Sequence, residues 1–306
     1  MTTPTLAITL GDPRGIGPEI VRAALATPGV AGAARYRVVG PTGAGVPVDE
    51  VIGDWTGGTG PSGVDAAGRA RDAEAGRLAG RAIERAVALA RAGTVQGIVT
   101  APIDKAALLL GGYDFPGHTE MLEALAGTPT TMMLASPRLR VVLATTHLAL
   151  RDVPAAVTRE RLLRAIAAAR TGLREWFGVA APRLALCALN PHAGDHGRFG
   201  TEDDALLAPV AREADVAGPF PADTVFVRAM RGEFDAVIAP YHDVGMTAIK
   251  VASFGEGVNV TLGLPYPRTS PDHGTALDIA GRGVARPDAM VAAMLTAVAI
   301  AGRVGR

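Results

Sequence analysis

The sequence predicts an α/β protein with mainly parallel sheets. Short apolar runs of strand length alternate along the 306 residues with longer segments in which small and apolar residues recur at helical spacing. Hydrophobic residues make up 48% of the chain, which is ample material for a core. The length favours two domains, or one large α/β unit, over a single small core.

The expected elements begin with a strand over 6–10 and a turn at Gly11-Asp12-Pro13. A helix then opens at Gly17-Pro18-Glu19, with proline at the first helical position and an acid in the first turn. Residues 41–69 are rich in Gly, Pro and Asp, which predicts irregular surface structure. The later elements are a helix over 72–92, a strand over 98–102, paired strands over 132–135 and 139–145, a helix over 159–176, a strand over 183–189, a helix over 203–214 capped by Thr201 with Asp204, a helix over 222–231, a strand over 235–240 and a C-terminal helix over 289–302.

Composition narrows the class of protein. Lys+Arg and Asp+Glu both number 30, so nucleic acid and anionic membranes are not expected as main partners. Cys187 is the only cysteine and lies in an apolar run, which predicts a buried, inert thiol and a cytoplasmic location. The first residues do not resemble a signal peptide, and the apolar stretch over 289–302 is shorter than the ~20 residues that span a bilayer.

Polar clusters recur directly after the apolar strands, where open α/β folds bind their ligands. His147, His192 and His242 each follow such a strand. One histidine there is more often a satisfied structural residue, but three together predict a catalytic divalent-metal site with open coordination positions. Asp243 beside His242 is either an acceptor that orients an imidazole or a solvated turn residue.

A second set of residues suits an anionic substrate. His118 and Thr119 follow Gly117 at a predicted helix start, where backbone N–H groups bind phosphate, although an ordinary helix cap is the alternative. Lys250, Asn259 and Arg268 recur at nine-residue intervals and together suit a phosphorylated or carboxylated substrate, although each alone is more often a surface residue. The chain has neither a G-x-G-x-x-G fingerprint after its first strand nor a Walker A loop.

Seven ordered motifs resemble the 4-hydroxythreonine-4-phosphate dehydrogenase family, which makes a precursor of pyridoxal 5'-phosphate (vitamin B6). They are GDPRGIGPEI, TAPIDKAAL, PGHTEML, ATTHLAL, LNPHAGDHGRFGTED, YHDVGMTAIK and GEGVNVTLGLPYPRTSPDHGTALDIAGRG. The resemblance covers nearly the whole chain and is weakest over 41–70, which is shorter than is usual in the family.

The resemblance implies an isocitrate/isopropylmalate dehydrogenase-like fold of two α/β/α domains around a central cleft, in a homodimer. It places residues 1–118 with 262–306 in a cofactor-side domain, and 119–261 in a domain with the metal ligands and the dimer interface. By motif it implies these site residues: His147, His192 and His242 for the metal, one of them from the partner; His118, Thr119, Lys250, Asn259 and Arg268 for the substrate; and His273, Gly274, Thr275 and Asp278 for the cofactor.

The implied reaction is the oxidation of 4-phosphooxy-L-threonine at C3 by NAD (or NADP), followed by loss of CO2 to give 3-amino-2-oxopropyl phosphate. Zn, Mg, Co or Mn would serve as the divalent ion, and Lys250 and Asp243 are the candidate general bases. The alternative is a paralogous dehydrogenase of 4-phosphothreonate or 4-phosphoerythronate, because Val244 stands where the family usually has Gln. A non-catalytic protein that binds metal or phosphate is the third option.

Overall fold

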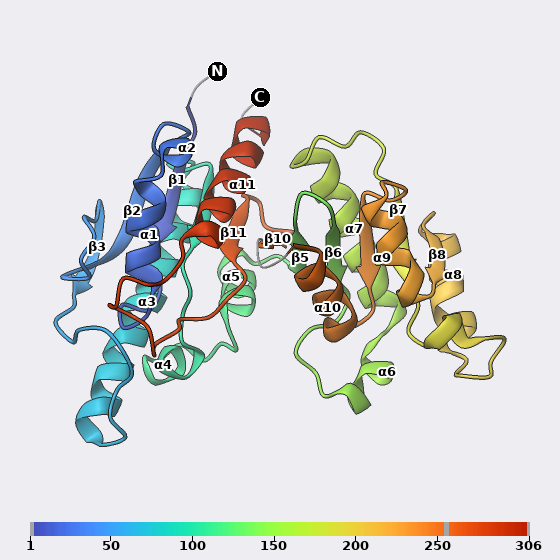
Figure 1. Cartoon of the computed structure of the whole chain (residues 1–306), viewed down its shortest axis with the longest axis horizontal. Helices are drawn as coiled ribbons and strands as arrows, with labels where there is room; N and C mark the ends of the chain where they lie inside the picture. Colours follow the sequence, from blue (N-terminus) through green and yellow to red (C-terminus); the bar gives the residue numbers. More distant parts are fainter. Residues whose placement is uncertain (1–2, 254–256, 305–306) are drawn as a thin grey trace. The chain divides into compact units, whose positions relative to one another are not determined.

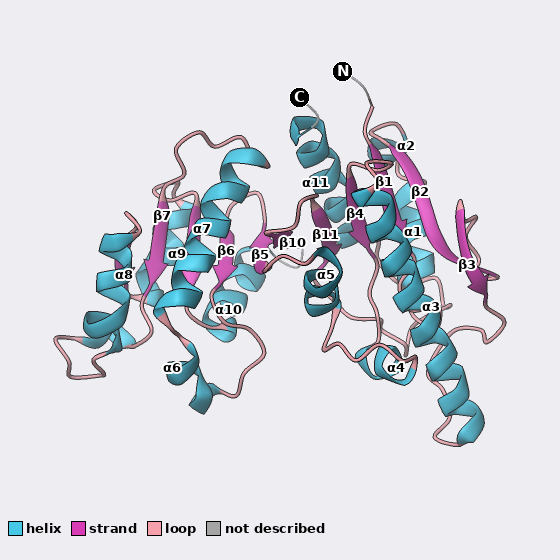
Figure 2. Ribbon diagram, turned by 180° about the vertical axis from the view of Figure 1, so that it is seen from behind, coloured by secondary structure: helices cyan, strands magenta, loops and turns pink. Residues whose placement is uncertain are grey.

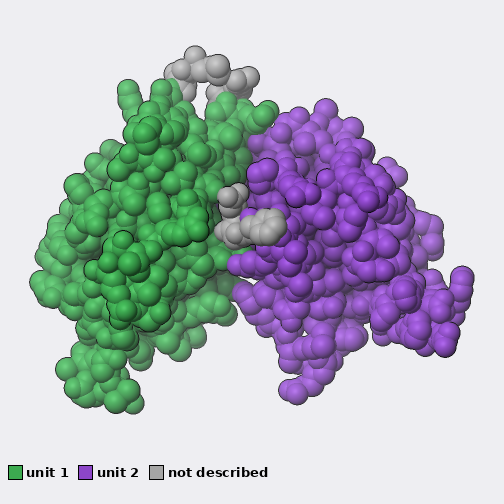
Figure 3. Space-filling model, viewed as in Figure 1, with its two compact units in different colours: residues 1–130, 264–306 green, residues 131–263 purple. Residues whose placement is uncertain are grey.

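The computed structural model describes residues 3–253 and 257–304, which fall into two compact units (Figures 1 and 3). Unit 1 comprises Met1–Thr130 and Leu264–Arg306, and unit 2 comprises Thr131–Gly263. The expected domain boundaries at 118/119 and 261/262 therefore move to 130/131 and 263/264. The reason is helix α5 (His118–Ala126), whose Met121 and Leu122 are buried in the apolar core of unit 1.

Unit 1 is built on parallel strands with helices on both faces. Its spatial order is β3 (Glu50–Asp54), β2 (Arg35–Thr42), β1 (Thr5–Thr9), β4 (Gly97–Thr100) and β11 (Arg268–Pro271). Ile98 faces the core cluster of the long helix α3 (Ala66–Arg91), whereas Thr269, in register with Val99, donates to the Ala293 carbonyl of α11 (Asp288–Val304). Because successive strand residues point to opposite faces, α3 and α11 cover opposite sides of the sheet. The remaining helices of the unit are α1 (Gly17–Leu25), α2 (Pro28–Ala31) and α4 (Lys105–Leu110).

Unit 2 has a mixed sheet in which the parallel part carries the strand-end histidines. Its order is β10 (Val258–Leu262), β5 (Thr131–Ala135), β6 (Arg140–Leu143), β9 (Ala236–Ala239), β7 (Leu184–Cys187) and β8 (Ala217–Phe220). β5 pairs antiparallel with β10 and β6, and the pairs from β6 to β8 are parallel. Its helices are α6 (Val153–Ala156), α7 (Arg159–Glu175), α8 (Ala208–Glu213), α9 (Ala222–Met230) and α10 (His242–Ser253), as Figure 2 shows.

The predicted mainly parallel α/β class is confirmed, and so are the paired strands on either side of Ser136. The expectation of irregular structure over 41–69 is wrong in part, because the short edge strand β3 and the start of α3 lie there. Among the residues of β3 only Ile52 is buried, so its pattern carries little hydrophobic signal.

The capped helix expected over 203–214 is also different. It begins as a π-helical turn over Asp203–Leu207 with no side-chain cap, and Asp203 is fully buried instead. In the ranges that the structure describes, no helix has the length and apolar character needed to cross a membrane.

Candidate active site

Three histidines follow three neighbouring strands of unit 2. β6, β9 and β7 are adjacent and parallel, so the segments that contain His147, His242 and His192 leave the same edge of the sheet. The rings of His147 and His242 lie with their centroids 5.4 Å apart and tilted by 46°. Two imidazoles at this separation can face a common ligand between them.

His242 is held in one orientation by its neighbour. It opens helix α10, and its Nδ1 lies 2.7 Å from Asp243 Oδ1. When the carboxylate accepts the Nδ1 proton, Nε2 is the nitrogen left to act as a ligand, which is the usual arrangement around metal-binding histidines. The Asp243 side chain is 82% exposed, so the pair lies at the surface of the unit.

His192 belongs to a loop with unusual backbone geometry. His192, Ala193, Asp195 and His196 have φ between 45° and 57°, a region that costs free energy for residues other than glycine. The loop begins at Asn190, whose backbone N–H and side-chain Nδ2 both donate to the buried carboxylate of Asp203 at 3.0 Å. Asp203 therefore anchors the start of this loop. The sequence did not predict this role, because acidic residues in the run Glu202-Asp203-Asp204 are typical of the first turn of a helix.

The predicted three-histidine site is only partly assembled in this chain. Across residues 3–253 and 257–304, no group of three His, Cys, Asp or Glu residues is placed to hold a metal ion. His192 contacts Phe199 instead, at 6.2 Å between ring centroids. The assignment of all three ligands to one metal stays a prediction.

Unit 1 brings two buried nitrogen-containing side chains together, Arg268 on β11 and His118 at the start of α5. Arg268 is 1% exposed and donates to Thr100 Oγ1 on the neighbouring strand. His118 at the start of α5 has an enclosed Nε2 that finds no hydrogen-bond partner within the described residues. Burial, and then the charges of Arg268 and Lys105, hold the pKa of His118 well below its usual range, so the imidazole is neutral at neutral pH.

This group of residues suits an anion. Burial lowers the pKa of Arg268 to about 9, so the guanidinium still carries its charge at neutral pH, and an anionic partner would offset the cost of burying it. The first N–H groups of α5, which include that of Thr119, add donors at the positive end of a helix dipole. Thr100 and Lys105 belong to the motif TAPIDKAAL, and Lys105 lies in a polar cluster that follows a predicted strand, but neither was assigned a role in the site.

Lys250 and Asn259, the other predicted substrate residues, belong to unit 2. Lys250 is exposed in the last turn of α10. Asn259 lies on β10, and its Oδ1 is enclosed without a hydrogen-bond partner in the described residues. A buried amide oxygen in this state is available to a ligand's donor. His118, Thr119 and Arg268 lie in unit 1, so the predicted substrate residues are divided between the two units.

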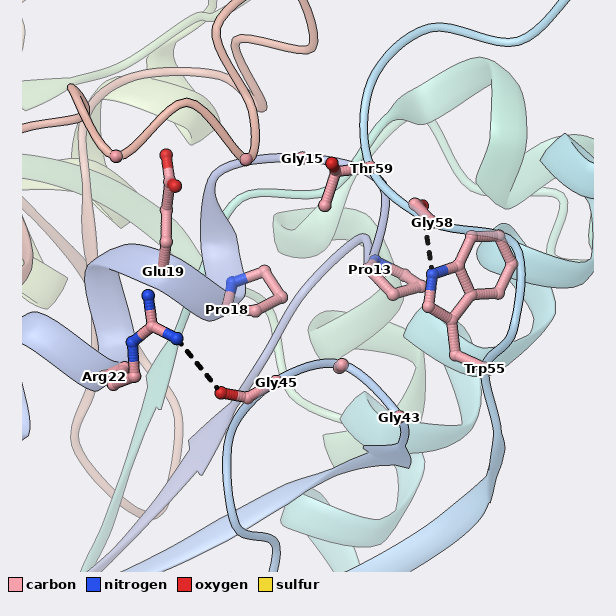
Figure 4. Close-up of a pocket in the computed structure, with 13 residues that line it drawn as sticks. Pro13, Gly15, Pro18, Glu19, Arg22, Gly43, Gly45, Trp55, Gly58 and Thr59 are labelled. Atoms are coloured by element: carbon pink, nitrogen blue, oxygen red, sulfur yellow. Dashed lines mark hydrogen bonds between the residues drawn. The ribbon is translucent and has the colours of Figure 1, made fainter.

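The predicted cofactor segment contacts the loop that forms one wall of a pocket within unit 1, but its four predicted residues are not among those that line the pocket. His273, Gly274 and Asp278 are exposed, while the Thr275 carbonyl accepts a hydrogen bond of 2.9 Å from Ile16 N–H. A Cβ on Gly15 would lie 2.8 Å from that carbonyl, so only glycine permits this approach. The pocket has a volume of about 330 Å³ (Figure 4), and these residues line it: Pro13, Gly15, Pro18, Glu19, Arg22, Gly43, Ala44, Gly45, Trp55, Gly58, Thr59, Gly281 and Gly283.

Two further residues from the sequence analysis take structural roles. Cys187 is fully buried on β7, and burial raises the pKa of its thiol to about 12, so it is unreactive as expected. Val244 is half-buried and packs against the apolar core of unit 2. Packing is therefore a sufficient reason for an apolar side chain at this position.

Known proteins share both the sequence and the fold. The family described as "Pyridoxal phosphate biosynthetic protein PdxA" matches residues 60–297. The 4-hydroxythreonine-4-phosphate dehydrogenase of Methylorubrum populi is 44% identical, covering 97% of this chain and 95% of that protein. The D-threonate 4-phosphate dehydrogenase of Cupriavidus necator is 42% identical, covering 98% of both chains.

Solved structures agree with these sequence matches. The 4-hydroxythreonine-4-phosphate dehydrogenase of Klebsiella pneumoniae superposes with a TM-score of 0.83 at 37% identity, over 98% of each chain. Isocitrate dehydrogenase from Methylococcus capsulatus, at 16% identity and a TM-score of 0.51, shares the fold alone. This similarity agrees with the predicted isocitrate dehydrogenase-like fold. The resemblance seen in the motifs is thus confirmed. The chain belongs to the family of the pyridoxal phosphate biosynthetic protein PdxA.

Proposed function

We propose that the protein is a nicotinamide- and divalent-metal-dependent dehydrogenase that oxidises 4-phosphooxy-L-threonine at C3. The observation that carries this proposal is the pair of imidazoles at 5.4 Å, with a carboxylate on one of them. The relatives named 4-hydroxythreonine-4-phosphate dehydrogenase supply the substrate. Oxidation followed by decarboxylation gives 3-amino-2-oxopropyl phosphate, CO2 and the reduced dinucleotide.

The donor set fits a divalent ion. His147 and His242 would hold it, and Asp243 would keep the His242 ring in the ligating orientation. When bound, such an ion lowers the pKa of a substrate hydroxyl and polarises the resulting ketone. Imidazole ligands accept Zn or Co readily and Mg or Mn less so.

The chain's own residues would bind the substrate and move its proton. Arg268 and the first turn of α5 would hold an anionic group, and Lys250 and Asn259 stay the other predicted substrate residues. A general base must take the hydroxyl proton, and Asp243 and Lys250 are the candidates. His273, Gly274, Thr275 and Asp278 would hold the dinucleotide, NAD or NADP, which supplies the hydride acceptor.

The third ligand points to a homodimer. Because His147 and His242 lie together and His192 does not join them in the described chain, we infer that His192 of a second copy completes the site. Mixing refolded His147→Ala and His192→Ala variants tests this inference. Random pairing would restore about one quarter of the wild-type activity, because half of the dimers would have one intact site of two. No recovery on mixing would refute the shared site.

A second candidate substrate is D-threonate 4-phosphate. Relatives with that name are as similar to this chain as those named for 4-hydroxythreonine-4-phosphate. Both compounds are phosphorylated four-carbon hydroxy acids, and they differ at C2, where one has an amine and the other a hydroxyl. Purified protein should be assayed with each compound, NAD or NADP, and each divalent ion, by following absorbance of the reduced dinucleotide. If 4-phosphooxy-L-threonine gives no reduction, the main proposal fails.

A further inference from the structure

A buried ion cluster lies directly behind the pocket of unit 1. Arg14, in the loop after β1, is 2% exposed. Its guanidinium donates to Asp12 through Nη2 at 2.6 Å and Nε at 3.0 Å, and to Asp72 through Nη1. Asp104 lies 3.7 Å from Nη2. One cation therefore binds three carboxylates.

The three carboxylates come from three different elements. Asp12 lies in the loop after β1, Asp72 lies on α3, and Asp104 caps α4 by accepting the Ala107 N–H at 2.7 Å. Removing one partner from a buried ion cluster leaves the others uncompensated, so separating the elements that carry these charges costs free energy. Arg14 thus ties the loop over 12–16 to α3 and α4.

That loop is itself part of the pocket wall and joins the other walls. Pro13 and Gly15 line the pocket (Figure 4), the Arg14 carbonyl accepts Gly60 N–H at 2.7 Å, and the loop contacts Thr275 as described above. Two other segments of the wall, which contain Thr59 and Gly281, also touch, since a Cβ on Gly281 would lie 2.3 Å from Thr59 Oγ1.

Arg71, the residue before Asp72 on α3, holds the wall segment over residues 55–61. Its guanidinium donates to the carbonyls of Gly57 at 2.8 Å, Gly58 at 3.0 Å and Pro61 at 3.1 Å. It also lies 5.9 Å from the centroid of the Trp55 ring, which lines the pocket. Arg71 and Asp72, which are consecutive on α3, therefore hold two wall segments that have no regular secondary structure of their own. Arg71 holds residues 55–61 directly, and Asp72 holds the loop over 12–16 through Arg14.

We propose that Arg14 and Arg71 are positioning residues that preform this pocket for the nicotinamide cofactor. The inference rests on the proposed function. Neither guanidinium is required to touch the cofactor; each holds loops that otherwise would have to be ordered on binding. Preformed walls lower the entropy cost of binding, so loss of either arginine weakens dinucleotide affinity.

The test compares Arg71→Met and Arg14→Met with Arg77→Met. Arg77 is the matched control, because it lies on α3 but forms its salt bridge with Glu74 at the surface, away from the residues that line the pocket. NAD affinity is read from the quenching of Trp55 fluorescence in a Trp176→Phe background, which removes the other tryptophan. We expect the dissociation constant for NAD to rise about tenfold or more in Arg71→Met and Arg14→Met. In both, kcat at saturating NAD and KM for the phosphorylated substrate stay within about twofold of wild type, and Arg77→Met leaves all three unchanged.

Arg71→Met keeps the inference testable if Arg14→Met does not fold, since Arg71 binds carbonyls at the surface. A folded Arg71→Met protein with wild-type NAD affinity would overturn this inference and leave the proposed function standing. An equal loss in kcat and in the affinity for both ligands would also overturn it, as general destabilisation. If the wild-type protein binds no nicotinamide dinucleotide, the proposed function fails and this inference fails with it.

Discussion

The charged groups of unit 1 are buried, whereas the histidine pair of unit 2 is more exposed. In unit 1, Arg14 is enclosed and bonded to carboxylates from three elements, and Arg268 is buried beside Thr100. In unit 2, His147 is exposed, and the His242 ring forms a hydrogen bond with the exposed Asp243 and a ring contact with His147. The charged groups of unit 1 are therefore enclosed within the unit, whereas the imidazole pair of unit 2 lies at its surface.

The difference has an energetic consequence. Breaking a buried ion cluster costs about 3–5 kcal/mol, because the remaining charges stay away from water. Removing an exposed side chain usually changes stability by less than about 0.5 kcal/mol. Changes in the histidine pair should therefore affect activity with little effect on folding, whereas changes in the buried groups of unit 1 should lower stability.

The largest effect is expected for His147→Ala. Loss of one imidazole should lower kcat/KM by at least about 100-fold and remove bound metal, while the unfolding midpoint stays near wild type. A chelator should inactivate the wild-type protein reversibly. His196→Asn is the control, because His196 is an exposed histidine outside the pair. Metal analysis and steady-state rates check the prediction, and a His147→Ala protein that retains metal and activity would contradict it.

Asp243→Asn should have the next largest effect. A neutral amide oxygen accepts the His242 Nδ1 proton more weakly than a carboxylate does, so metal affinity should fall about 10- to 100-fold. The matched control is Asp223→Asn, an exposed acid in the first turn of α9, which removes the same charge from a helix start. Metal titration distinguishes the two variants. Equal affinity in both would show that Asp243 is a solvated residue.

The pH dependence of stability should reveal the buried histidine of unit 1. Because the pKa of His118 is lowered in the folded state, the unfolded chain binds the extra proton as pH falls below the usual histidine value of about 6.5. Wild-type stability should therefore decline on acidification from pH ~7.5 to ~5.5 more than that of His118→Gln. Urea unfolding at both pH values measures this, and parallel declines would mean that His118 titrates normally.

The smallest effect is expected for Val244→Gln. A polar amide placed against the core of unit 2 should cost about 1 kcal/mol of stability. If Val244 only packs, the preference between 4-phosphooxy-L-threonine and D-threonate 4-phosphate should change less than about twofold. Val251→Gln on the exposed face of the same helix is the control. A preference change of tenfold or more would assign Val244 a role in specificity.

The local sequence predicted the elements whose pattern is strong. The period of helix α7, the proline at the start of α1 and the apolar runs of β4, β7 and β9 all depend on neighbouring residues. Strand β3 and the buried role of Asp203 were missed, since neither a short edge strand nor an acid in an acidic run differs from surface sequence.

By itself the sequence determined the fold class, the family and the placing of three histidines after apolar strands, because these follow from local periodicity and from motifs in fixed order. Only the tertiary structure decided which groups meet. Arg14 and Asp72 are 58 residues apart in the chain, and Arg268 and Thr100 are 168 apart. Side-chain contacts across such separations depend on how helices and strands pack, which no local pattern records. The same holds for the histidines: the sequence gives three at one sheet edge, and packing brings His147 to His242.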